Sequence, residues 1–223
     1  MLSFIENIGL ILQRYGAVFA QGLWNTLWLS FVSVFLGTFL GILVALGKLS
    51  RHKLLNGVVS TYIEIIRGTP ILLQLYFFWL ALPNILPSIS DTTCILSALV
   101  VNASAYIAEV IRAGIQAVDA GQREASLSLG MTERAIMTKV IFPQAIKNIL
   151  PALGNEVIVM IKQTSLASVF FFGELMTAYK QVQSTTFLAL EPLTISGLIY
   201  LFLTVTLSRI TSHFEKRMKQ NER

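Results

Sequence analysis

The chain has 223 residues, of which 54% are hydrophobic and only 13% are charged. A soluble domain carries about 25% charged residues, so this chain has too little charge to remain a solvated disordered segment or to follow nucleic-acid phosphates. Lipid is therefore the expected solvent, provided that the apolar residues gather into stretches that can cross about 30 Å of hydrocarbon.

The positions of the charged residues indicate about five such stretches. They lie between Arg14 and Lys48, at about 54–86, between Asp91 and Glu109, at about 146–172 and at about 192–207. The second is expected to be one long, interrupted helix. The third is short for a span, and the fourth contains Glu156 and Lys162, so hydropathy supports it least.

Lysine and arginine concentrate after the first span, in the loop 112–147 and in the C-terminal tail, whereas only Arg14 and Lys180 lie on the other side. The positive-inside rule therefore places the N-terminus outside and the C-terminus in the cytoplasm of a multi-pass plasma-membrane protein. The net charge of +5 indicates topology and contact with anionic lipid, and it predicts no nucleic-acid partner.

The N-terminal segment has no basic region before a short apolar core, so the first span is expected to remain in the mature protein. Residues 1–15 show helical spacing of apolar side chains and are expected along the outer surface as an amphipathic segment. Gly37 and Gly41 form a G-x-x-x-G pair in the first span. This pair predicts close helix packing, with a partner helix in this chain or in a second copy.

Enzyme motifs are missing from the sequence. It has no G-x-S-x-G, no H-E-x-x-H and no cluster of cysteine and histidine, and its two histidines lie beside basic residues. We therefore expect no catalytic residues, no metal site and no cofactor in this chain. Gly47-Lys48 lacks the spacing and the following Ser or Thr of a phosphate-binding loop, so the chain is not expected to hydrolyse ATP.

Polar residues at membrane depth usually face a bundle interior or a wet cavity, because a charge at a helix centre costs about 2.5–3.5 kcal/mol on insertion scales. Gly68 and Pro70 are expected to break the second span and to expose backbone groups to a polar ligand. The candidate substrate-pathway residues are Gly68, Thr69, Gln74, Asn102, Asn155, Glu156 and Gln163. The alternative is that these groups only satisfy one another between helices.

The loop 112–147 is the longest loop, and it is too small to bury a core of its own. Over residues 122–142 it mixes apolar and charged residues, with Gly130 as the main helix breaker. This pattern predicts a helical loop that docks onto another protein. A loop that lies flat on the membrane is the alternative.

Two sets of motifs resemble a known family. Glu124-Ala125-Ser126-x3-Gly130, followed by Val140-x-Phe142-Pro143, is similar to the E-A-A-x3-G-x9-I-x-L-P loop motif in membrane permease subunits of bacterial ATP-binding-cassette (ABC) importers. The departures are Ser126, Val140 and Phe142. Three further segments are similar to the polar amino acid branch: Arg67-Gly68-Thr69-Pro70-x3-Gln74, the LPALGNE segment at 150–156, and Lys162-x-Thr164-Ser165-Leu166.

The resemblance implies an all-α, polytopic membrane protein with the MetI-like fold of type I importers, as a single permease domain over 1–223 that includes the coupling loop 112–147. It implies ATP-driven import of a polar amino acid by alternating access. The implied partners are an ATPase subunit dimer that binds ATP-Mg, an external solute-binding protein and a second permease subunit, identical or a sister. The implied coupling residues are Arg123, Glu124, Ala125, Ser126, Gly130 and Pro143.

For the ligand site we expect the broken second span to face the fourth, with Glu156 neutralising a substrate ammonium. If Glu156 binds a side-chain cation, the substrate is arginine, lysine or histidine; if it binds the α-amino group, glutamine, glutamate and cystine stay open. Lys162 either extends toward the membrane surface or pairs with a carboxylate.

Two other functions are compatible with the spans. A passive pore needs no ATPase but leaves the loop motif between Glu124 and Pro143 unexplained. A membrane scaffold that only recruits a cytosolic protein predicts no substrate-dependent ATPase stimulation.

Overall fold

The computed structural model describes residues 2–220, which form helices and no strand. The elements are α1 (Leu2–Lys48), α2 (Lys53–Gly68), α3 (Ile71–Ile85), α4 (Asp91–Gln116), α5 (Ala120–Ser128), α6 (Glu133–Ile136), the π-helical turn η1 (Met137–Ile141), α7 (Phe142–Gln163), the 3-10 helix η2 (Thr164–Phe170), α8 (Leu175–Thr186) and α9 (Leu190–Gln220). The all-α prediction is confirmed.

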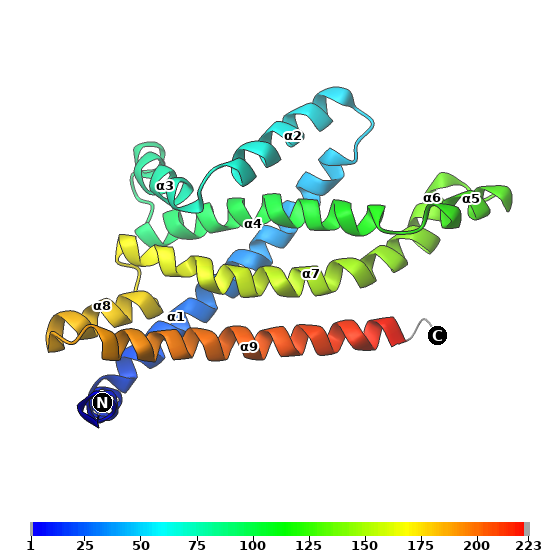
Figure 1. Cartoon of the computed structure of the whole chain (residues 1–223). Helices are drawn as coiled ribbons and strands as arrows, with labels where there is room; N and C mark the ends of the chain where they lie inside the picture. Colours follow the sequence, from blue (N-terminus) through cyan, green and yellow to red (C-terminus); the bar gives the residue numbers. More distant parts are fainter. Residues whose placement is uncertain (1, 221–223) are drawn as a thin grey trace.

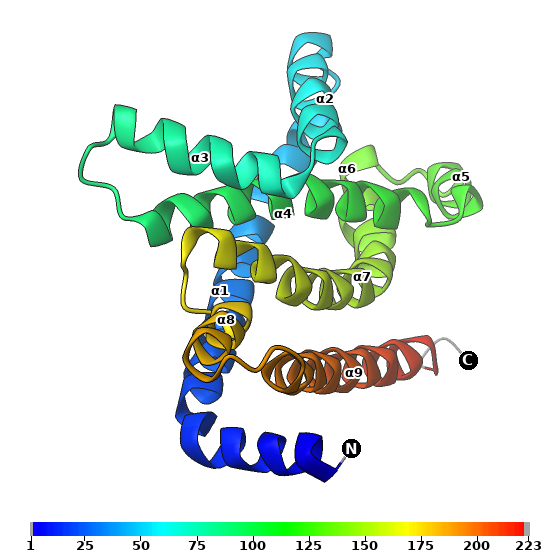
Figure 2. The ribbon, with the colours of Figure 1, turned by 60° about the vertical axis from the view of Figure 1, so that its left-hand side comes forward.

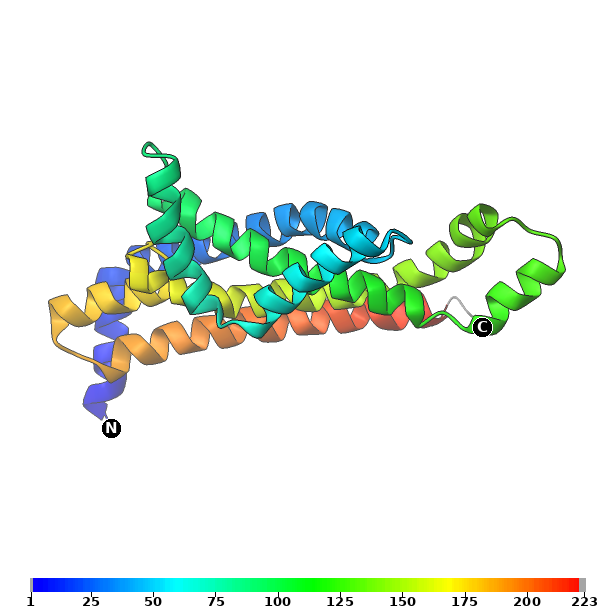
Figure 3. The ribbon, with the colours of Figure 1, turned by 90° about the horizontal axis from the view of Figure 1, so that it is seen from above.

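Helices α4, α7 and α9 run side by side, and α1 crosses them diagonally (Figure 1). Helix α1 contacts α2, α4, α7, α8 and α9. Seen from above, α5, α6 and the end of α9 lie at one end of the bundle, called here the loop end (Figure 3). The start of α1, the α3–α4 connection and α8 lie at the opposite end, called the far end. The chain therefore crosses the bundle an odd number of times, as predicted.

Three helices, α1, α4 and α9, are long and apolar enough to cross a membrane. Two bent pairs raise the number to five if each counts as one span: α2 with α3, bent by 108°, and residues 133–170 with α8, bent by 46°. The break in the second span falls where glycine and proline predicted it, because Thr69 and Pro70 are extended.

The third span is longer than expected. Helix α4 has 26 residues and continues past Glu109 to Gln116. The charge of Glu109 does not end the helix because Arg112, one turn later, pairs with it at 2.8 Å. An ion pair inside the helix lowers the cost of placing a charge near the apolar stretch.

The glycine pair of α1 packs against a helix of the same chain. A Cβ atom on Gly37 would lie 2.6 Å from Cβ of Ala103, and one on Gly41 would lie 2.9 Å from Cγ2 of Ile107, both on α4. Small residues let the two backbones approach closely. The partner left open by the sequence is therefore α4, and the main core around Leu29, Leu75 and Leu99 lies beside this contact.

Helix α1 has 47 residues, about 70 Å at 1.5 Å per residue, which is more than twice the hydrocarbon thickness. Its first turns point sideways from the rest (Figure 2). This part buries Ile11 and Phe19 in a second core with residues of α8 and α9, and Asn7 donates a hydrogen bond to Glu191 at 3.1 Å. The segment expected along the outer surface is thus continuous with α1 and packs on protein, apart from Met1, which lies outside the described residues.

Two exposed phenylalanines at the far end adopt left-handed backbone conformations. Phe171 follows η2 and Phe187 follows α8; both have φ 57°, and their exposed fractions are 88% and 89%. A left-handed conformation costs a residue with a Cβ atom about 1–2 kcal/mol, and glycine avoids this cost.

Phe187→Gly is expected to unfold at a higher temperature than Phe187→Ala. Both variants lose the same exposed ring, so the difference of about 1 kcal/mol reports the left-handed strain. Thermal unfolding in detergent measures it. The matched control is Leu198, 58% exposed on α9, where alanine should be more stable than glycine by about 1 kcal/mol. The same order at both positions would contradict the assignment of strain to Phe187.

Candidate functional site

A group of buried polar side chains lies at the break between α2 and α3. Gln74 Nε2 donates to the Ile66 carbonyl at 2.7 Å and to Thr69 Oγ1 at 2.9 Å. Asn102 Nδ2, on α4, donates to Gln74 Oε1 at 2.9 Å. The break leaves the Ile66 carbonyl without its usual helical partner, and the Gln74 amide supplies the hydrogen bond instead. We call Thr69, Gln74 and Asn102 the polar junction.

The polar junction brings together three of the predicted pathway residues and also shows what they do. The amide nitrogen of Gln74 donates to the Ile66 carbonyl of α2, and its amide oxygen accepts from Asn102 of α4, so Gln74 links the break to α4. Gly68 lies next to it in open space, since a Cβ atom there would meet nothing within 4 Å. These bonds tie the break to α4, and the open surface beside the junction begins at Gly68 and Arg67.

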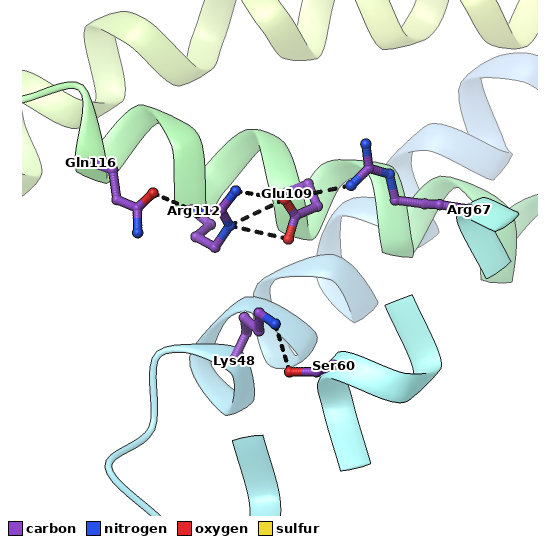
Figure 4. A network of polar contacts seen from close by, with 6 residues as sticks. All are labelled: Lys48, Ser60, Arg67, Glu109, Arg112 and Gln116. Carbon is purple, nitrogen blue, oxygen red and sulfur yellow. Dashed lines mark hydrogen bonds and ion pairs between the residues drawn. The ribbon is translucent and has the colours of Figure 1, made fainter. Parts of the chain in front are cut away.

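Arg67 is the charged group of this region. Its guanidinium lies over the Tyr106 ring, 5.3 Å from the centroid. Its Nη1 is 3.5 Å from Glu109 Oε2 (Figure 4), with 43% of the side chain exposed. Arg67 thus pairs with a carboxylate of α4 and keeps 43% of its side chain exposed.

Sequence reasoning missed Tyr106 and Glu109, and it quoted Arg67 only as part of a motif. A signal was present in the spacing. Tyr106 and Glu109 follow Asn102 by one and two helical turns, so all three share a face of α4. Because Asn102 was predicted to lie on the substrate pathway, its position on α4 could have placed Tyr106 and Glu109 on the same side of the helix.

The three predicted residues of α7 separate. Glu156 is half-buried on α7, and Gln163 is half-buried at the end of the helix. Asn155 is exposed and lines a different hollow of about 540 Å³ between α7 and α9, which none of the polar-junction residues lines. Lys162 is exposed, and its ammonium group makes no hydrogen bond or ion pair with another residue of 2–220.

The predicted coupling loop forms a helical hairpin at the loop end. Helix α5 ends at Ser128, two residues before Gly130, which has φ 77°. Gly130 N donates to the Leu127 carbonyl at 2.9 Å and Met131 N to the Ser126 carbonyl at 3.1 Å. This bonding pattern terminates helices at a left-handed glycine. Gly130 therefore supplies the turn, as predicted.

An ion pair closes the hairpin, because Arg123 Nη2 lies 2.5 Å from Glu133 Oε1. The hydrogen bond that Arg123 donates to Glu133, together with the negative charge of that carboxylate, raises the pKa of Arg123 above its usual range. Glu124 and Ala125 are exposed on α5, Ser126 is buried, and Leu129 at the tip has an exposed fraction of 82%. The hairpin thus presents the apolar side chain of Leu129 at its tip, away from the bundle.

Pro143 stands at the start of α7, where a helix tolerates a residue without an N–H group. Helical structure runs from Glu133 to Phe170 without a break, and Pro143 lies in the first turn of α7 directly after η1. Proline has no N–H for the usual helical bond, and a π-helical turn before it changes the bonding pattern locally. The hairpin is thus mechanically continuous with α7.

Comparison with known proteins defines the class. A family model described as "Binding-protein-dependent transport system inner membrane component" matches residues 37–220. The chain belongs to this family of inner-membrane permease subunits of ABC transporters, and the resemblance seen in the motifs is confirmed.

Within the family, the chain is an amino acid ABC permease subunit. It is 38% identical to the arginine transport system permease protein ArtQ of Bacillus subtilis, over 91% of this chain and 93% of that protein. It is 35% identical to the glutamine transport system permease protein GlnP of Escherichia coli, over 89% and 92%.

Solved structures agree with this assignment. A crystal structure of an amino acid ABC transporter with histidines superposes with a TM-score of 0.90 at 48% identity, covering 93% of this chain and 97% of that one. An inward-facing MetNI methionine ABC transporter shares the fold, with a TM-score of 0.75 at 21% identity over 90% and 96%. The predicted MetI-like fold is therefore confirmed.

Proposed function

We propose that this subunit, as a single permease domain over 1–223, carries a polar amino acid across the plasma membrane by alternating access. The observation that carries the proposal is the partly exposed guanidinium of Arg67 beside the open backbone at Gly68, together with the half-buried carboxylate of Glu156 on α7. An α-amino acid is a zwitterion, and these two side chains supply the opposite charges for its carboxylate and its ammonium. Relatives described as arginine and glutamine permeases support the same substrate class.

In this proposal Arg67 binds the substrate carboxylate through its two-pronged guanidinium, which suits carboxylates geometrically. Glu156 binds an ammonium, and the open backbone at Gly68 contributes further hydrogen bonds. The polar junction holds this arrangement in place. Gln163 lies seven residues after Glu156 on the same face of the helical run and extends the pathway toward the far end.

The proposed assembly pairs this chain with a second permease subunit, identical or a sister, and with an external solute-binding protein. An ATPase dimer that binds ATP-Mg seats the hairpin through Arg123, Glu124, Ala125, Ser126 and Gly130, and Pro143 lies where the hairpin continues into α7. The loop end is then cytoplasmic and the start of α1 is outside, in agreement with the positive-inside rule. Family membership favours this role over a passive pore or a scaffold.

Glu156→Gln is expected to weaken substrate binding about ten-fold or more, because a charged hydrogen bond contributes about 1.5–3 kcal/mol. The measurement is binding of radiolabelled L-arginine, L-histidine and L-glutamine to the permease–ATPase complex in nanodiscs, followed by uptake in proteoliposomes with the solute-binding protein. The matched control is Glu64→Gln, an exposed carboxylate on α2. Unchanged binding and uptake by an intact Glu156→Gln complex would remove this residue from the site.

A further inference from the structure

Glu109 lies between two arginines that come from different helices (Figure 4). Arg112 is on α4, one turn after Glu109, and Arg67 is at the end of α2. The Glu109 side chain has an exposed fraction of only 18%, against 43% for Arg67 and 30% for Arg112. The Glu109 carboxylate is therefore the most buried of the three groups, and both arginines bind to it.

The two arginines are held unequally. Arg112 Nε lies 3.1 Å from each Glu109 oxygen, and its Nη2 lies 2.8 Å from Oε2. Arg67 approaches the same Oε2 only to 3.5 Å and makes an ion pair with no hydrogen bond. Arg112 also donates to Gln116, so it is anchored at both ends. Arg67 is thus the loosely held cation, on the element that borders the proposed substrate site.

The proposed function places a second carboxylate, Glu156, at the same substrate site. If Arg67 paired directly with Glu156, the two charges that a zwitterionic substrate needs would neutralise each other. In the structure Arg67 pairs with Glu109 instead, and no ion pair joins it to Glu156. Because Arg112 also binds Glu109, Glu109 holds Arg67 weakly enough for Arg67 to turn toward a substrate carboxylate.

We propose that Glu109 is a positioning residue that keeps Arg67 apart from Glu156 and presents its guanidinium to the substrate carboxylate, and that Arg112 sets the strength of this hold. The inference rests on the proposed function, in which Arg67 and Glu156 bind the two ends of the amino acid. Glu109 itself makes no contact with the substrate in this arrangement.

The test measures binding of radiolabelled L-arginine, L-histidine and L-glutamine to the permease–ATPase complex in nanodiscs. Glu109→Gln is expected to weaken binding about five-fold, the upper range for a partly exposed ion pair. In an Arg67→Gln background the same substitution should have no further effect, because Glu109 acts only through Arg67. Assembly and basal ATP hydrolysis should be unchanged.

Three variants complete the design. Glu64→Gln is the matched control: it removes one carboxylate three residues before Arg67, where no ion pair with Arg67 exists, and it should bind like the wild type. Glu109→Asp keeps a charge beside Arg67 and should recover part of the loss; it also replaces Glu109→Gln in the cycle if that complex fails to assemble. Arg112→Gln releases Glu109 to hold Arg67 more tightly and should weaken binding as well.

The outcomes separate the two proposals. Two results would overturn the positioning role and leave the proposed function standing. In the first, the losses of binding from Glu109→Gln and Arg67→Gln are additive. In the second, Glu109→Gln binds like the wild type while Arg67→Gln binds weakly. If the wild-type complex binds none of the three amino acids, or if Arg67→Gln binds them normally, the proposed function fails first.

Discussion

Leu129→Asp is expected to abolish ATP-driven uptake of the amino acid while the helical bundle stays folded. Leu129 is 82% exposed at the tip of the α5–α6 hairpin, so its side chain contributes little to the stability of the permease fold. Burial of a leucine in a partner contributes about 1.5–3 kcal/mol, and an unpaired carboxylate in its place adds a desolvation cost. Association with the ATPase should therefore fall about 100-fold or more.

Co-purification of the ATPase with the permease measures this association, and uptake in proteoliposomes measures the consequence. Leu54→Asp is the matched control, because Leu54 is 83% exposed at the start of α2 and lies outside the hairpin. It should retain the ATPase. A Leu129→Asp complex that keeps its ATPase and its uptake would show that the hairpin docks through other residues.

Gly37→Leu is expected to prevent stable packing of α1 on α4. Even the first added atom would lie 2.6 Å from Cβ of Ala103 and 3.3 Å from the Val100 carbonyl oxygen. Overpacking a close helix contact costs about 3 kcal/mol, and here the backbone itself must move. The variant should unfold at a clearly lower temperature in detergent and lose its monodisperse peak in size-exclusion chromatography.

Gly9→Leu, in the same helix, is the control, since a Cβ atom there meets nothing within 4 Å. A second test uses the smaller change: Gly37→Ala should be destabilised, and Ala103→Gly in the same chain should restore part of the loss by removing the opposing Cβ atom. Equal stability of Gly37→Leu and Gly9→Leu would contradict the packing described here.

The sequence predicted those features that depend on local chemistry. The break at Gly68–Pro70 follows from backbone properties of glycine and proline, and the turn at Gly130 follows from its left-handed dihedral angle. Charge placement correctly predicted an odd number of crossings. Each of these features has its cause within a few residues, so a single sequence contains the information.

Features that depend on distant partners were harder to predict. Helix α4 extends past Glu109 because Arg112 and Arg67 neutralise that charge, whereas a hydropathy pattern counts it as a stop. No sequence pattern predicted α8. The buried Glu174 caps this helix by accepting a hydrogen bond from Met176 N at 2.7 Å, and Tyr200 of the distant helix α9 donates to the same carboxylate at 2.8 Å. Asn155 and Glu156 are neighbours in sequence but face different surroundings on α7.

The sideways start of α1 has a consequence for how the chain matures in the membrane. Ile11 and Phe19 pack in one core with Ile195 of the last helix. This core therefore cannot form until the last helix has been synthesised. At about 5–20 residues per second, that delay is roughly 10–40 s. During this time the earliest part of the protein has no native partner, and insertion factors or lipid must shield it. Quality control of this subunit should therefore be most sensitive to truncation at its C-terminal helix.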